Sequence, residues 1–246
     1  MCIRNRSRLA KGLPTAIATV LLFGAFFQYP GGAFDKTASA QEPPPFGLPF
    51  DSPPGPSTWL LGQTYGNTTG AFFNRSTTYR AGQGIHFGMD FSAPCGTPIV
   101  AIGDGVVAKV DDPFHGSAPH NLMVNHTNGY ASFYGHLLER PSLQVGEQVR
   151  RGQVIAQVGD PDLTCTSRPH LHLEIRNAGV YSQAFNPITL IDADWDSLSL
   201  IGPFGRGFAR DLNDPRRWQR LDDQPDITFG GPLLNNFENP WPLEWN

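Results

Sequence analysis

The chain has 246 residues, enough for one folded domain with a sizeable core and for additional segments. Its 27 glycines and 23 prolines make up about a fifth of the sequence, which favours a loop-rich β protein over a helical bundle. After residue 40 the chain holds 13 basic and 21 acidic residues, a net charge of −8. This balance argues against a nucleic-acid partner, because binding phosphates requires a basic surface.

Residues 1–40 have the pattern of an export signal. Four basic residues lie within the first 11, and an apolar run of 15 residues follows over 13–27, short for a membrane span. The small residues Ala-Ser-Ala at 38–40 form a cleavage pattern before Gln41. We expect a signal peptide over 1–40 and a periplasmic, cell-envelope or secreted chain without a stable membrane span after cleavage. An uncleaved N-terminal anchor is the alternative, and it exports the rest of the chain as well.

The remaining sequence divides into three parts. Residues 41–57 contain seven prolines and are expected to form an extended linker. Residues 58–190 contain short β-rich runs separated by turn residues, and Asn128-Gly129 is a strong hairpin signal. We expect an all-β fold, an antiparallel sheet or flattened barrel-sandwich, with strands at 98–102, 105–110, 122–126, 130–136, 154–158 and 170–176. Residues 191–246 hold four of the five tryptophans and read as a loop-rich C-terminal extension. That extension either packs its aromatic residues on the β core, which we favour, or binds substrate or a partner.

Two cysteines, Cys95 and Cys165, follow the export signal. An even number of cysteines in an oxidising compartment suggests a disulfide bond, and two free buried thiols are the alternative.

Histidines and one aspartate carry the candidate chemistry. His86 and Asp90 are four residues apart in a stretch that we expect to be extended, and His170 and His172 are two apart in an expected strand, so each pair would share one face. His136 lies at the end of another expected strand. Two imidazoles and one carboxylate would give three zinc ligands with a fourth position free for water, which is the catalytic pattern. Two further histidines would then be available to move protons.

Ordered motifs from about residue 84 to 176 resemble the lysostaphin-type, or LytM-like, zinc metallopeptidases. These motifs are His-x-Gly-x-Asp-Phe at 86–91, Gly-Asp-Gly-Val-Val at 103–107, Tyr-x-His-Leu at 134–137, Val-Gly-Glu-x-Val at 145–149 and Pro-His-Leu-His-Leu-Glu-Ile at 169–175. The resemblance implies a largely antiparallel β fold with an open groove. It also implies Zn²⁺ bound by His86, Asp90 and His172, with His136 and His170 as catalytic residues. The expected substrate is the peptide part of bacterial peptidoglycan.

Other polar residues receive more ordinary interpretations. We expect Glu174 at a surface or core-edge position, with support of a zinc ligand as the alternative. His115 and His120 are expected at the surface and His126 in a structural role. A disulfide between Cys95 and Cys165 would join the two loops that carry expected zinc ligands and would preorganise the site.

The sequence thus predicts a zinc-dependent endopeptidase that hydrolyses peptide bonds of peptidoglycan. One alternative is a non-catalytic protein of the same fold that activates another wall hydrolase, although such proteins normally lose metal-site residues and all five are present here. A zinc peptidase acting on proteins is the other. The bond that is cut and the oligomeric state are left open by the sequence.

Overall fold

The computed structural model describes residues 42–201, 209–214 and 217–236, and the expected signal peptide lies outside them. Most of its regular structure is β-strand: β1 (Leu60–Gln63), β2 (Met89–Ser92), β3 (Pro98–Val100), β4 (Gly105–Val110), β5 (His120–Asn125), β6 (Tyr130–Leu137), β7 (Gln148–Val149), β8 (Val154–Gln157), β9 (His170–Asn177), β10 (Gln183–Phe185), β11 (Ala209–Arg210), β12 (Trp218–Gln219) and β13 (Ile227–Thr228). The α-helices are α1 (Thr69–Phe73) and α2 (Trp195–Ile201), and single 3₁₀ turns cover Pro113–His115, Pro187–Thr189 and Leu221–Asp223. Among the described residues, no helix is long and apolar enough to cross a bilayer.

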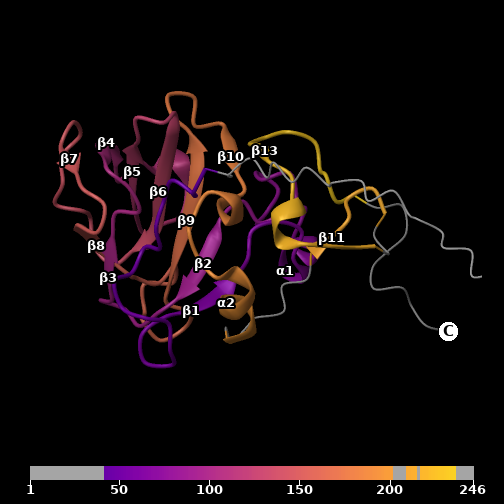
Figure 1. Cartoon of the computed structure of the whole chain (residues 1–246), viewed down its shortest axis with the longest axis horizontal. Coiled ribbons are helices and arrows are strands. Elements are labelled where there is room, and N and C mark those ends of the chain that lie inside the picture. Colours follow the sequence, from indigo (N-terminus) through magenta and orange to yellow (C-terminus); the bar gives the residue numbers. More distant parts are fainter. Residues whose placement is uncertain (1–41, 202–208, 215–216, 237–246) are drawn as a thin grey trace, which may run out of the picture. The chain divides into compact units, whose positions relative to one another are not determined.

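Most of the strands form one large antiparallel sheet, in the order β1-β2-β9-β6-β5-β4-β7, and β11 and β12 pair separately (Figure 1). Strand β10 adds to β9, and β13 adds to β10, while β3 and β8 form a separate two-stranded ribbon. All paired strands are antiparallel, so the expected all-β antiparallel fold is confirmed. The six strands expected from the sequence are all present, with ends shifted by no more than two residues.

The strand β9 shows how the sheet separates a core from a polar face. Leu171, Leu173 and Ile175 are fully buried and belong to the main hydrophobic cluster. Because side chains alternate along a strand, the intervening positions from His170 to Arg176 place polar side chains on the opposite face. This alternation positions the candidate site.

The proline-rich segment before residue 58 is part of the domain body. Phe46 and Phe50 are only 2% and 6% exposed, and Phe50 stacks on Trp59 with ring centroids 5.2 Å apart. Backbone bonds from Phe46 to Leu190 and from Gly47 to Ile102 fix the segment along the domain. The segment lacks regular secondary structure, as its prolines predict, but it is not a free spacer. Its two buried phenylalanines contribute to the core.

The described part of the C-terminal extension packs on the sheet. Trp195 and Ile227 are buried in the main core cluster, and β13 continues the large sheet through β10. This agrees with the interpretation of the extension as a wrap over the core. Trp241 and Trp245 lie outside the described residues, as does the side chain of Trp218.

Candidate metal centre and groove

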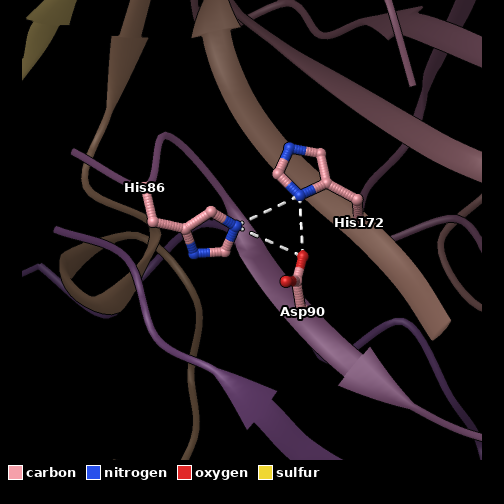
Figure 2. A group of neighbouring side chains, drawn as sticks. All are labelled: His86, Asp90 and His172. Atoms are coloured by element: carbon pink, nitrogen blue, oxygen red, sulfur yellow. Dashed lines mark hydrogen bonds and ion pairs between the residues drawn. The ribbon is translucent and has the colours of Figure 1, made fainter. Parts of the chain in front are cut away.

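Three side chains converge on the polar side of β2 and β9. Asp90 and His172 are direct partners in the antiparallel register of these strands, and Asp90 Oδ1 lies 2.7 Å from His172 Nδ1. His86 Nε2 lies 3.3 Å from each of these two atoms. Figure 2 shows the three side chains pointing toward one another.

His86 reaches the cluster differently from the sequence-based expectation. Strand β2 begins at Met89, so His86 and Asp90 do not share a strand face. His86 instead lies in the preceding loop, where its backbone bridges Gly66 and its Nδ1 donates to the carbonyl oxygen of Thr64 at 2.8 Å. The loop therefore aims Nε2 at Asp90.

The arrangement suits a tetrahedral zinc ion. Ligand atoms about 2.0–2.1 Å from a tetrahedral zinc lie about 3.3 Å from one another, close to the separations between these three side chains. The possible ligand atoms of His86, Asp90 and His172 all lie within 4.8 Å of one another. Gly88 leaves room for the His172 ring, since a Cβ at that position would lie 2.7 Å from His172 Cε1. The donor set of two nitrogens and one oxygen, with three protein ligands, matches catalytic zinc sites.

Hydrogen bonds behind the histidines select the tautomer that a metal requires. The Thr64 carbonyl accepts the Nδ1 proton of His86, which leaves a lone pair on Nε2. In His172, Nε2 lies 3.2 Å from Glu174 Oε1 and donates to it, which leaves Nδ1 facing Asp90. Both ring nitrogens that face the centre can therefore act as ligands.

Contacts within the centre shift the pKa values of Asp90 and His172. Burial alone would raise the pKa of Asp90, but His86 and His172 hold it well below its ordinary value. Burial likewise opposes the charged form of His172, while the hydrogen bonds that its ring donates to Asp90 and Glu174 raise its pKa to about 9. A divalent cation at Nδ1 would displace this proton, because histidine binds metals as the neutral imidazole.

The other two expected site residues lie beside this cluster. The His136 and His170 rings have centroids 4.7 Å apart, and His136 lies 6.0 Å from His172. His136 Nδ1 donates to the Ala118 carbonyl, and His170 Nδ1 donates to the Arg168 carbonyl at 2.7 Å. Each ring therefore carries its free lone pair on Nε2. Burial and the neighbouring His172 and His170 rings together lower the pKa of His136 to about 4, although its hydrogen bond to Ala118 opposes this shift.

All five side chains line one groove of about 760 Å³. Its lining includes residues of β1 and β2, Tyr79 and the segment 167–170. Tyr79 was not singled out by the sequence, because it lies in a turn-rich stretch without a repeating pattern. Its ring packs edge-on against His86 with centroids 5.5 Å apart, and its hydroxyl donates to Gln63 at 3.1 Å.

Comparison with known proteins agrees with the sequence motifs between residues 84 and 176. The sequence model of Peptidase family M23 matches residues 84–187, a range that holds all five side chains. The chain contains a peptidase family M23 domain. This confirms the family resemblance found in the sequence.

The M23 domain is also similar to named proteins. Over 106 residues it is 39% identical to the peptidoglycan DD-endopeptidase ShyC of Vibrio cholerae, a match that covers 43% of this chain and 22% of ShyC. Over 107 residues it is 37% identical to the DD-carboxypeptidase/endopeptidase Mpg of Neisseria meningitidis, covering 43% of this chain and 23% of Mpg. The chain thus spans about a fifth of the length of these curated relatives.

Solved structures give local matches as well. A variant of the catalytic domain of the M23 protein EnpA from Enterococcus faecalis is 27% identical, covers 56% of this chain and 95% of its own, and has a TM-score of 0.43. The catalytic domain of lysostaphin from Staphylococcus simulans is 24% identical, covers 52% and 86% respectively, and has a TM-score of 0.37.

A disulfide bond joins Cys95 and Cys165 in the M23 domain, which confirms the expected pairing. Cys95 lies in the loop that follows β2, and Cys165 lies in the loop that precedes β9, so the bond connects the loops next to two candidate ligands. In the second loop Asp160 accepts hydrogen bonds from Ser167 and Thr164. Although burial opposes ionisation, the bonds from Asp162 N–H and Ser167 lower the pKa of Asp160 to about 2.

Glu174 is not at the surface or core edge, so that expectation was wrong. Its side chain is fully buried, contacts His172, and accepts a hydrogen bond from Arg176 Nε at 2.7 Å. The sequence contained a signal for this placement. In the run from His170 to Arg176 every second residue is polar, which indicates a shared polar face within an otherwise apolar strand.

The remaining histidines of the M23 domain divide into three cases. His126 is buried between the Asp104 carbonyl and the Ser132 hydroxyl, which agrees with a structural role. His120 is partly exposed and paired with Asp111 at 2.9 Å. The side chain of His115 is only 8% exposed and contacts Arg176, so its expected surface position was wrong.

Proposed function

We propose that this protein is a zinc-dependent endopeptidase that hydrolyses peptide bonds of bacterial peptidoglycan. One observation carries the proposal: three ligand atoms converge at zinc-like spacing in a groove that also holds two histidines with free Nε2 lone pairs. The names of the similar proteins, a peptidoglycan DD-endopeptidase and a DD-carboxypeptidase/endopeptidase, support the substrate class.

His86, Asp90 and His172 would hold the zinc ion. When bound, zinc lowers the pKa of a coordinated water and polarises a peptide carbonyl. The protein supplies the tautomers that leave His86 Nε2 and His172 Nδ1 unprotonated, and Asp90 supplies an ionised carboxylate.

His136 and His170 would handle the protons of hydrolysis. Each ring is fixed by a main-chain carbonyl on Nδ1, so Nε2 can accept a proton in the groove and later release it to the amine of the departing peptide. A ring that carries a proton can also donate a hydrogen bond to the oxygen on which negative charge develops. The two rings share the same tautomer, and we assign these roles to the pair.

We also propose export to the cell envelope. The basic start, the apolar run and the small residues at 38–40 support it. Peptidoglycan lies outside the cytoplasmic membrane, so the proposed substrate requires the same location.

The test uses residues 41–246, purified and incubated with isolated peptidoglycan, followed by metal analysis and mass spectrometry of released peptides. We expect one zinc per chain and peptide release, both lost in His172→Ala and strongly reduced in Asp90→Asn. Asp51→Asn is the matched control, because Asp51 is exposed and lies outside the groove. A folded chain that binds zinc but releases no peptide would refute the peptidoglycan substrate. Cleavage confined to a protein substrate would favour a protein-directed peptidase.

A further inference from the structure

Residues 221–235, named here the C-terminal brace, contact the protein beside both histidine ligands. The brace includes β13, which pairs with β10, and Phe229 N–H then donates to the Ser182 carbonyl at 2.8 Å. This pairing fixes the position of Phe229 relative to the large sheet.

The brace holds the loop that carries His86. Gln83 forms hydrogen bonds with three residues of the brace. Its side-chain Oε1 accepts from Thr228 N–H at 2.7 Å and its side-chain Nε2 donates to the Pro232 carbonyl. Its backbone carbonyl accepts from Leu234 N–H at 2.8 Å. Asn235 donates to the Gly84 carbonyl at 2.6 Å and is fully buried. These bonds end two residues before His86, so the brace determines the path from which that side chain reaches the centre.

The brace also contacts the side chains behind His172. Arg176 lies between two aromatic rings, with its Cζ 4.5 Å from the centroid of Phe133 and 4.6 Å from that of Phe229. It donates to both carboxylate oxygens of Glu174, at 2.7 and 2.9 Å, and Glu174 in turn accepts from His172 Nε2. The side chains of Glu174 and Arg176 are 0% and 4% exposed, so the pair is shielded from water.

Phe229 is also connected to His172 through Phe87. Its ring packs edge-on against Phe87 with centroids 5.2 Å apart, and Phe87 packs edge-on against His172 at 5.4 Å. One residue of the brace therefore supports both the carboxylate that orients His172 and the ring that lies against it.

We propose that the C-terminal brace is part of the metal centre, and that Glu174, held by Arg176 and Phe229, is a positioning residue for His172. The inference rests on the zinc site of the proposed function. A carboxylate behind a histidine ligand fixes its tautomer and orientation, and loss of such a partner typically weakens metal binding about 10–100-fold.

Zinc affinity, measured by competition with a chelator on residues 41–246, tests this inference without using activity. We expect Phe229→Ala to raise the dissociation constant by about 10-fold, toward the lower end of that range. We expect the double variant Glu174→Leu/Arg176→Met to raise it by up to about 100-fold. The double variant removes both buried charges together, which preserves folding better than removing one partner. In the Co²⁺-loaded protein, both should shift the visible absorption bands.

Phe46→Ala is the matched control, because Phe46 is a buried core phenylalanine outside the groove. It should lower thermal stability and leave zinc affinity and the Co²⁺ spectrum unchanged. Wild-type affinity and spectrum in the Phe229→Ala and double variants would overturn the inference alone. A wild-type chain that takes up no zinc would overturn the proposed function and this inference together.

Discussion

Removing the Cys95–Cys165 bond tests how far this cross-link stabilises the domain. The two residues are 70 positions apart, and closing a loop of this length in the unfolded chain corresponds to about 4 kcal/mol on the chain-entropy model. Cys165 is exposed and Cys95 only partly buried, so serine substitutions remove little packing. For a domain of this size each kcal/mol shifts the unfolding temperature by about 2–4 °C, which predicts a decrease of roughly 8–16 °C.

The assay is thermal unfolding of residues 41–246 with and without reductant, beside the Cys95→Ser/Cys165→Ser variant. These are the only cysteines in that segment, so a reductant acts on this bond alone. The variant should match the reduced wild type and should not respond further to reductant. A decrease below about 2 °C in both cases would refute the argument that this loop closure stabilises the fold.

The rate of substrate hydrolysis provides a second test of what the Cys95–Cys165 disulfide bond does. The loops it joins contribute Pro94 and the segment 167–170 to the groove. At a temperature where both forms are folded, the reduced protein should cut its substrate more slowly. Equal rates would show that the groove keeps its shape without the bond.

Three other changes give separate outcomes. Gly88→Ala should abolish zinc binding, as metal analysis would show, because a Cβ there would lie 2.7 Å from His172 Cε1. Gly70→Ala in α1 is the control: its Cβ would contact only Gln63, at 3.7 Å, and zinc binding should stay intact. Phe91→Ala should lower the free energy of unfolding by about 3–5 kcal/mol in urea titrations, because the ring is fully buried in the core. The lowered pKa of Asp160 contributes stability above the ordinary aspartate pKa near 4, and this contribution should disappear as the pH falls toward 2; Asp160→Asn should lack it, as acid-unfolding curves would show.

The long strands were predictable from local patterns. The segments at 105–110, 130–137 and 170–177 are rich in β-branched and aromatic residues or alternate between apolar and polar, and the structure contains them as strands. The short strands β1, β10 and β13 have too few residues for a periodic signal. They exist because partners far away in the sequence pair with them, which local propensity does not encode.

It was predictable that the set of five candidate residues would line one groove, because spacing and family motifs converge on it. The contacts that surround the set were not. Glu174 was expected at a surface or core-edge position. A lone carboxylate is costly to bury, but Arg176 lies two residues away on the same face and neutralises it. Phe46 and Phe50 were assigned to a spacer because prolines dominate their segment, and their burial depends on core surface supplied by Trp59 and other residues.

The distance along the chain between the candidate ligands links metal uptake to folding. Asp90 and His172 are 82 residues apart and become neighbours only when β2 and β9 pair in register. An unfolded chain offers no such pair, so zinc should bind the native state preferentially. Mass action then makes apparent stability depend on free metal: at 100 times the dissociation constant, the ion adds about 2.7 kcal/mol to the free energy of unfolding. Melting temperatures of ligand-site variants are therefore comparable with wild type only at a fixed and buffered zinc concentration.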